Sequence, residues 1–411
     1  MISRRSAKAL SLLLFACIFA TAVSADAQFG RLGDRLKRGV EEATDKAADK
    51  AENSVRCAIG DTACREKAKA EGKKVVDEPA APSAAPNANA AAGSTEKPGE
   101  GAWVNYDFVP GSRPLYVEDF TRDPVGDFPR RLELIDGNME VAEWKGGRYL
   151  RVTSWPGKVE IRLPEALPER FTVEFDATPG YNSNWTIFKF AEKPEEDVRF
   201  RLYGGKGMGG VFGPRHQTQG LTTSPLADGQ VYRGRIMADG RYVKVYMNDT
   251  RVANIPNAEI GRSNKIEIEI PGTADAPAFI SNISVMAGGK KLYDALAEAG
   301  RVATQGIYFD TGSDRIRPES TATLKEIAAM LQEHPELKLT IEGHTDNSGN
   351  PQANQDLSQR RAAAVAAFLT ASAKVDATRL SAVGLGDKTP AAPNATPEGR
   401  QQNRRVELVK R

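Results

Sequence analysis

The sequence predicts a multidomain protein in which an antiparallel β-sandwich is followed by a smaller α/β domain. Three observations support this prediction. The chain has 411 residues, against roughly 100 to 200 for one domain. Short stretches in which apolar and polar residues alternate fill its middle, and strand-like and helix-like periods alternate near its C-terminal end. The formal net charge of +2 gives no general attraction to polyanions, and no nucleic-acid recognition motif is present, so nucleic acid is not expected as a partner.

Residues 1–27 have the pattern of a secretory signal peptide. Basic residues precede an apolar run from Leu10 to Val23, and small residues suited to cleavage follow up to Ala27. The apolar run is shorter than the roughly 20 residues that span a bilayer, so we expect export rather than a retained membrane helix. A lipid anchor on Cys17 stays open, although Phe15 is larger than a lipobox favours.

Residues 28–77 are alanine-rich with interspersed charges of both signs, which favours exposed helices. Cys57 and Cys64 lie here, and an exported protein meets an oxidising compartment. In one straight helix their Cα atoms would be about 10 Å apart, whereas a disulfide rarely tolerates more than about 7 Å. Because Gly60-Asp61 supplies a turn, we expect a helical hairpin closed by a Cys57–Cys64 disulfide; two free thiols are the alternative. Residues 78–102 lack large apolar side chains and are predicted to be a linker.

Residues 103–287 are predicted to form the sandwich, because short alternating segments there are separated by Gly, Pro and Asp-Gly. The predicted strands are Arg148–Ser154, Arg170–Thr178, Trp185–Phe190, Val198–Tyr203, Val231–Asp239, Arg241–Asn248, Lys265–Ile270 and Phe279–Met286. This part looks like a jelly roll of the laminin-G or concanavalin type. Such a resemblance of fold identifies no ligand. The partner of the sandwich stays open between an outer-membrane protein and a glycan.

Two motifs in the sandwich are misleading. Gly205 to Gly210 fits the G-x-G-x-x-G nucleotide pattern, but no helix opens after it, so we expect a loop. Glu174 and Asp176 share one face of a predicted strand, as the paired carboxylates of some jelly-roll glycosidases do. A further glutamate is missing after them, since Thr178 follows, and we expect a solvated sheet face rather than catalysis.

Aromatic residues of the sandwich allow a sugar-binding interpretation. Tyr181, Trp185 and Tyr203 could stack on a sugar ring, although aromatic residues more often pack in a core.

Residues 288–304 are predicted to be a connector with a short helix, and residues 305–411 an α/β domain. The expected elements are strand Ile307–Phe309, helix Pro318–Glu333, strand Leu337–Gly343, a helix from Pro351, strand Leu380–Val383 and strand Arg404–Val409. Alternating strands and helices favour a βαβαβ unit whose helices cover a sheet.

Arg361 is the residue of this domain that needs an explanation. It lies in the apolar stripe of the helix that begins near Pro351. A guanidinium cannot lose its charge under ordinary conditions, and burying it without an anionic partner costs several kcal/mol. Asp346, in the loop before the helix, or an anionic ligand between the two side chains, is the expected partner.

Three blocks resemble the peptidoglycan-binding domain of the OmpA-like family: Ile307 to Ser320, Gly343 to Val365 and Glu398 to Leu408. The resemblance implies that Asp346 and Arg361 grip the zwitterionic end of diaminopimelate in the peptide stem of peptidoglycan. An internal salt bridge that only orders the loop is the alternative.

Further residues are expected to support this site. Asn354 and Thr345 are assigned to peptidoglycan binding, and Asn403 and Arg404 to a supporting role. No cofactor is expected. His344 adjoins the site, but the chain has only three histidines, His216, His334 and His344, so no metal site is expected either.

Together these features predict a non-enzymatic cell-envelope protein that links the outer membrane or periplasmic partners to diaminopimelate-type peptidoglycan. Its expected location is the periplasm, in association with the cell outer membrane and the cell wall. The main alternative is a polysaccharide-modifying enzyme with a catalytic sandwich and a C-terminal wall tether. An adaptor whose sandwich binds a protein partner is a second alternative.

Overall fold

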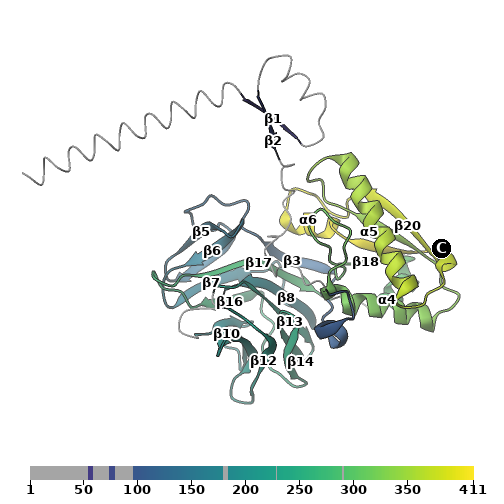
Figure 1. Cartoon of the computed structure of the whole chain (residues 1–411). Coiled ribbons are helices and arrows are strands. Elements are labelled where there is room, and N and C mark those ends of the chain that lie inside the picture. The colour runs from purple at the N-terminus through teal and green to yellow at the C-terminus, as the bar shows by residue number, and fades with distance from the viewer. Residues whose placement is uncertain (1–53, 59–73, 79–95, 179–183, 228, 289–290) are drawn as a thin grey trace, which may run out of the picture. The chain divides into compact units, whose positions relative to one another are not determined.

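The computed structural model describes residues 54–58, 74–78, 96–178, 184–227, 229–288 and 291–411 (Figure 1). The chain divides into two compact units, Met1–Pro82 and Ser83–Arg411. Several expectations lie outside the described residues: the signal peptide with Cys17, most of the linker, Cys64 and Tyr181.

In the first unit, β1 (Ser54–Ala58) pairs in parallel with β2 (Lys74–Glu78). The expectation of helix is therefore wrong for these residues. Val55 lies opposite Val75, and branching at Cβ favours extended backbone. Cys57 lies in β1, so the geometry from which the helical hairpin was argued does not apply to it, and the disulfide stays a prediction.

The second unit begins with a sandwich of two sheets in which all strand pairings are antiparallel. One sheet has seven strands in the order β12 (Gln217–Pro225), β11 (Lys206–Phe212), β10 (Asp197–Tyr203), β9 (Thr186–Lys189), β16 (Lys265–Ile270), β7 (Gly157–Arg162) and β4 (Leu132–Asp136). The alternating isoleucines of β16 are all buried, as the period-two pattern predicts.

The other sheet holds the order β15 (Thr250–Ile255), β14 (Tyr242–Met247), β13 (Tyr232–Asp239), β8 (Arg170–Ala177), β17 (Ala278–Ala287), β6 (Gly147–Val152) and β5 (Met139–Trp144), with β3 (Arg113–Glu118) beside β17. Phe175 of β8 contacts Phe188 and Phe200 of the first sheet, with ring centroids 4.6 and 5.0 Å apart. Large apolar side chains from both sheets thus form one core, and the predicted antiparallel β character is confirmed. A short 3-10 helix, η1 (Gly101–Asn105), precedes the sandwich and buries Trp103.

The glycine-rich segment expected as a loop is instead strand β11. Its glycines are needed for close packing. A Cβ on Gly210 would lie 2.0 Å from the carbonyl oxygen of Thr218 in β12, and one on Gly207 would lie 2.4 Å from the sulfur of Met247. Glycine inside a strand often marks such a close approach, which sequence inspection took for loop character.

The C-terminal part of this unit is built on a four-stranded sheet in the order β18 (Arg301–Thr304), β21 (Val406–Lys410), β19 (Leu339–His344) and β20 (Leu380–Gly386). The strands β19 and β20 run parallel, whereas β21 is antiparallel to both neighbours. The helices are α3 (Leu292–Ala299), η3 (Pro318–Ser320), α4 (Thr321–Glu333), α5 (Pro351–Ala371), η4 (Ala377–Arg379) and α6 (Pro397–Asn403).

Two details differ from the sequence expectation. The edge strand is β18 rather than Ile307–Phe309, where a single bridge joins Phe309 to Ile316. Helix α6 was missed, because its seven residues carry no apolar period.

One face of the sheet packs on the helices. Leu339 and Ile341 of β19 and Leu408 of β21 share a core with α4 and α5. The residues next to Ile341 and Leu408 in sequence, Glu342 and Glu407, are paired with each other and point to the opposite face. In the part of the chain that the structure describes, no helix has the length and apolarity needed to cross a membrane.

Candidate functional site

The candidate site lies where β19 ends and α5 begins. A Cβ on Gly343 would lie 2.2 Å from the carbonyl oxygen of Ser358, so glycine at this position lets α5 pack directly on the strand. Asn350 caps α5, and its side chain accepts hydrogen bonds from the amides of Gln352 and Ala353. The loop between the two elements is thereby held at a defined strand end and a defined helix start.

Asn354 shapes this loop from the first turn of α5. It is buried, and its Nδ2 donates to the carbonyl oxygens of Asp346 at 3.3 Å and Ser348 at 3.1 Å. Both amide protons are thus directed at the loop backbone. The position of Asn354 beside Asp346 agrees with the sequence expectation, while its part in holding a ligand stays a prediction.

Asp346 is 6% exposed and is held by two donors. Its Oδ2 accepts from Nη1 of Arg404 at 2.6 Å, and its Oδ1 accepts from the amide of Ser348 at 3.0 Å. A carboxylate offers about four acceptor positions, so capacity remains for a further donor. Arg404, expected in a supporting role, is the ion-pair partner of Asp346.

Arg361 makes a different set of contacts. Its Nε donates to the carbonyl oxygen of Ser313 at 2.9 Å and its Nη2 to that of Asp310 at 3.3 Å, and the guanidinium lies 4.9 Å from the centre of the Phe309 ring. Within the described ranges, no carboxylate forms an ion pair with it. The Nη1 group and one proton of Nη2 are left for another acceptor.

The surroundings of Arg361 disfavour the charged form of its guanidinium. Burial, followed by the positive charges of Arg360 and Arg404, lowers the pKa of Arg361 to about 10. Asp314 and Asp346 act in the opposite direction without offsetting this. An anion placed at the free edge of the guanidinium would relieve the imbalance.

The two remaining predicted site residues differ in their contacts. Asn403 is fully buried and holds the segment before α6: its Oδ1 accepts from the amides of Ala391 and Ala392, and its Nδ2 donates to Asn394. Thr345 is buried, and its Oγ1 has no hydrogen-bond partner among the described residues.

Sequence inspection missed one cluster next to this site. Glu342 and His344 of β19 and Glu407 of β21 bring their ligand atoms within 4.8 Å of one another. Burial, with a contribution from Arg405, lowers the pKa of His344 to about 4, so its imidazole is neutral at pH 7. The two glutamates are 65 residues apart in the chain, and no local spacing signals the cluster.

The carboxylates expected on a solvated sheet face are buried instead. Glu174 accepts from Nε of Arg235 at 3.0 Å and from the hydroxyl of Tyr308 at 2.9 Å. Asp176 forms a bidentate pair with Arg233, at 2.8 and 2.9 Å. The expectation was wrong because β13 places an arginine opposite each carboxylate, a partner that strand alternation cannot reveal.

Trp185 and Tyr203 lie on the outer side of the seven-stranded sheet rather than in the core. The Arg201 guanidinium lies 4.1 Å from the Trp185 ring centre and 5.0 Å from the Tyr203 ring centre. Tyr203 is exposed to solvent. Arg201 thus packs against both rings, and sugar binding by these aromatic residues stays a prediction.

Comparison with known proteins assigns the C-terminal part. Residues 308–404 match the OmpA family. The chain is 41% identical over 133 residues to outer membrane porin F of Pseudomonas aeruginosa, which covers 32% of this chain and 36% of that protein. It is 42% identical over 103 residues to the peptidoglycan-binding protein ArfA of Mycobacterium tuberculosis, covering 25% and 31%.

Among solved structures, the peptidoglycan-associated lipoprotein from Burkholderia pseudomallei is 34% identical, with a TM-score of 0.24, and covers 26% of this chain and 88% of that one. The chain spans about a third of the length of the two curated relatives. Residues 308–404 of this chain thus form a domain of the OmpA family.

Proposed function

We infer that the OmpA family domain binds peptidoglycan, and that its ligand is the zwitterionic end of diaminopimelate in the peptide stem. The observation that carries this proposal is Arg361, a largely buried cation whose contacts are carbonyl oxygens and a ring rather than a carboxylate. ArfA, a relative over this domain, is named as peptidoglycan-binding, which supports the same conclusion.

The geometry suits a ligand with one carboxylate and one ammonium group. The ligand carboxylate would accept two hydrogen bonds from the free edge of Arg361, the bidentate arrangement that a guanidinium favours. The ammonium would donate to Asp346, whose two internal donors leave acceptor positions unused. The charges of the ligand would then be opposed by the charges of these two side chains.

We propose a non-enzymatic role for the whole chain, as an exported envelope protein that connects the outer membrane or a periplasmic partner to the wall. Glu174 and Asp176 support this view, because both are buried and held by arginines, and a general acid or base must be able to reach its substrate. The alternative of a polysaccharide-modifying sandwich predicts new reducing ends when the protein is incubated with wall glycans.

Co-sedimentation of the purified protein with isolated sacculi tests the binding proposal. Arg361→Ala and Asp346→Ala should each weaken binding to diaminopimelate-type sacculi by about 2 to 5 kcal/mol, because removing one partner leaves the ligand charge poorly compensated. Walls with lysine in place of diaminopimelate keep the ammonium and lose the carboxylate, so the unmutated protein should bind them poorly.

Arg360→Ala is the matched control, since it removes the same charge from the exposed neighbouring position of α5. It should pellet with sacculi as the unmutated protein does. Equal pelleting with both wall types, or full binding by Arg361→Ala with an unchanged circular dichroism spectrum, would rule out the assignment.

A further inference from the structure

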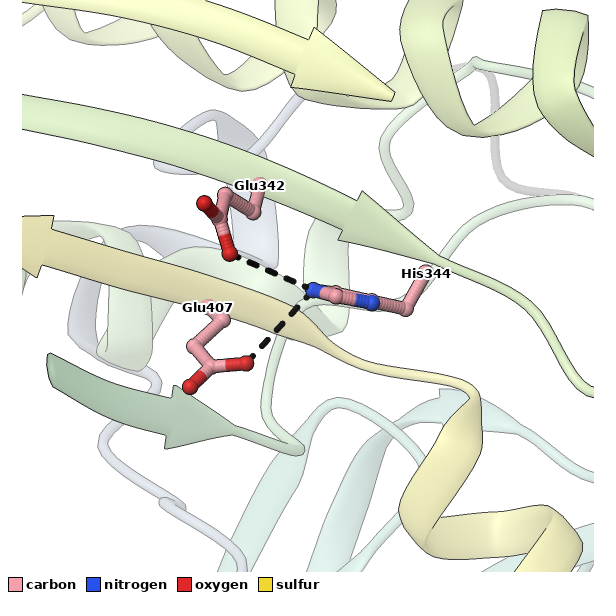
Figure 2. A group of neighbouring side chains, drawn as sticks. All are labelled: Glu342, His344 and Glu407. Carbon is pink, nitrogen blue, oxygen red and sulfur yellow. Dashed lines mark ion pairs between the residues drawn. The ribbon is translucent and has the colours of Figure 1, made fainter. Parts of the chain in front are cut away.

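Two glutamates face each other on the sheet face that the helices leave uncovered. Glu342 of β19 is the direct cross-strand partner of Glu407 of β21. Like charges in that position repel and destabilise a sheet, so a cation is expected beside the pair, and Arg301 donates to both carboxylates. Figure 2 shows both side chains directed toward the ring of His344, which follows Glu342 by two residues on the same face of β19.

The imidazole of His344 is the second observation that points to a ligand. The residue is 4% exposed, its Nδ1 lies 3.1 Å from Oγ1 of Thr389, and its Nε2 has no hydrogen-bond partner in the described part of the chain. That nitrogen lies 3.7 Å from a carboxylate oxygen of Glu342 and 3.5 Å from one of Glu407 (Figure 2). These separations are too long for hydrogen bonds.

We propose that Glu342, His344 and Glu407 form a binding site for a divalent transition metal ion, with Zn²⁺ as the best-fitting ion. Zinc bonds to nitrogen and oxygen are about 2.0 to 2.2 Å long, so neighbouring ligand atoms of a tetrahedral site lie about 3.3 Å apart. The ring nitrogen needs to move only a few tenths of an ångström relative to each carboxylate oxygen. The two carboxylate oxygens, which lie within 4.8 Å of each other, must also approach to about the tetrahedral separation. If Nδ1–H donates to Thr389, Nε2 presents its lone pair to the ion.

A cavity of about 520 Å³ gives access to the site. Its lining includes Glu342, Glu407, Arg301 and Arg405, so an ion can enter from the side of the carboxylates, with His344 behind them. Solvent or a small anion from the cavity would complete the fourth position. Sites with three protein ligands and one open position are common for zinc.

Two arginines compete with the ion for the carboxylates. Arg301 donates to Glu407 at 2.5 Å and to Glu342 at 2.9 Å, and Arg405 donates to Glu407 at 2.9 Å. The Arg301 side chain is 52% exposed and can turn into the cavity. The ion would therefore replace Arg301 as the cation between the glutamates, which predicts that removing this arginine strengthens metal binding.

The ligand types favour zinc over calcium or magnesium. The hard cations take six or more oxygen ligands, whereas this cluster supplies two carboxylates and one imidazole. An imidazole is a common ligand of zinc and of other transition metals. No metal site was expected because the chain has only three histidines, yet one histidine suffices when strand pairing brings two carboxylates to it.

Isothermal titration of chelator-treated protein with Zn²⁺ tests the proposal. We expect saturable binding at one site that His344→Gln weakens at least tenfold, that Glu342→Gln also weakens, and that Arg301→Ala strengthens severalfold. Titration with Co²⁺ should produce the visible absorption of a tetrahedral site, which His344→Gln removes. Magnesium and calcium should give no saturable binding.

His334→Gln is the matched control. This histidine is the C-cap residue of α4 and stacks on Tyr293, with ring centroids 3.6 Å apart, and its replacement should leave zinc binding unchanged. Binding that survives His344→Gln would place zinc elsewhere, for example at His216, and would overturn the proposal, as would no saturable zinc binding at millimolar concentration. The gain in zinc affinity expected for Arg301→Ala tests the site independently of the variants that lose a ligand, because unfolding cannot raise affinity.

Discussion

Two arginines of the second unit, one fully buried and one partly buried, have opposite surroundings. Arg235 of β13 is 1% exposed and lies 3.0 Å from Glu174 and 3.9 Å from Glu319. The rings of Tyr106 and Phe108 both have their centres 5.6 Å from its guanidinium. Arg361 of α5 has one ring and two carbonyl oxygens instead.

The electrostatic consequences differ accordingly. Burial alone would lower the pKa of both side chains. For Arg235 the electrostatic interactions with Tyr106, Glu174 and Glu319 together more than offset burial and raise the pKa above its ordinary value. For Arg361 burial prevails and the pKa falls to about 10. A buried cation with internal partners contributes to the fold, whereas one without them is suited to binding an external anion.

The largest expected effect on stability belongs to Arg235→Met. Removing the cation leaves Glu174 and Glu319 buried with less compensation, and breaking a buried ion pair from one side costs about 3 to 5 kcal/mol. Denaturant unfolding followed by fluorescence measures the loss. Arg241→Met, at a position whose side chain is 57% exposed, is the control and should change stability by less than about 1 kcal/mol. Equal effects of the two variants would contradict a structural role for the buried ion pairs of Arg235.

A smaller, pH-dependent effect is expected at Glu118 in β3. This side chain is 1% exposed; its Oε1 accepts from the amide of Phe120, while its Oε2 lies 3.6 Å from Arg131. Burial raises the pKa of Glu118 to about 7, against the pull of the Phe120 amide and Arg131. The folded state therefore holds the proton more tightly than the unfolded state, whose pKa is about 4.3.

The sign of the effect follows from linkage. Stability from Glu118 is fully present below its unfolded pKa and is lost as the pH rises through about 7. In the unmutated protein the free energy of unfolding should decline on the order of 2 kcal/mol between about pH 5 and pH 8 because of Glu118, and Glu118→Gln should remove this decline. The readout is the difference between the two unfolding curves at each pH. Glu143→Gln, which is exposed, should keep the decline; parallel curves for Glu118→Gln and the unmutated protein would contradict the prediction.

Asn350→Ala should destabilise α5 by about 1 kcal/mol, since it removes the cap that accepts from Gln352 and Ala353. Because α5 carries Arg361, this change tests the support of the binding site without touching its charges. Amide hydrogen exchange in the first turn of α5 should accelerate about fivefold. Exposed Asn347 serves as the comparison, and Asn347→Ala should leave exchange there unchanged.

Arg361→Met should have the smallest effect on stability, within about 1 kcal/mol, because loss of two hydrogen bonds to carbonyl oxygens is offset by removal of a poorly compensated buried charge. Denaturant unfolding measures this directly. A loss as large as that of Arg235→Met would show that Arg361 is a structural residue, and would weaken the case for a ligand.

The sequence by itself determined the class of most elements and the identity of the C-terminal domain. Alternating isoleucines predicted Lys265–Ile270, and the structure has this strand with the same bounds. The three family blocks pointed to Asp346 and Arg361, and the OmpA family assignment of residues 308–404 is confirmed. These inferences succeeded because alternation, helical period and motif spacing are properties of neighbouring residues.

Only the tertiary structure decided which charges meet. The pairing of Asp346 with Arg404 instead of Arg361, and of Glu174 with Arg235, depends on segments far apart in the chain. The juxtaposition of Glu342 with Glu407 depends on the register of β19 against β21. A shift of one residue in that register would send every side chain of one strand to the other face, so no local pattern in the sequence contains this information.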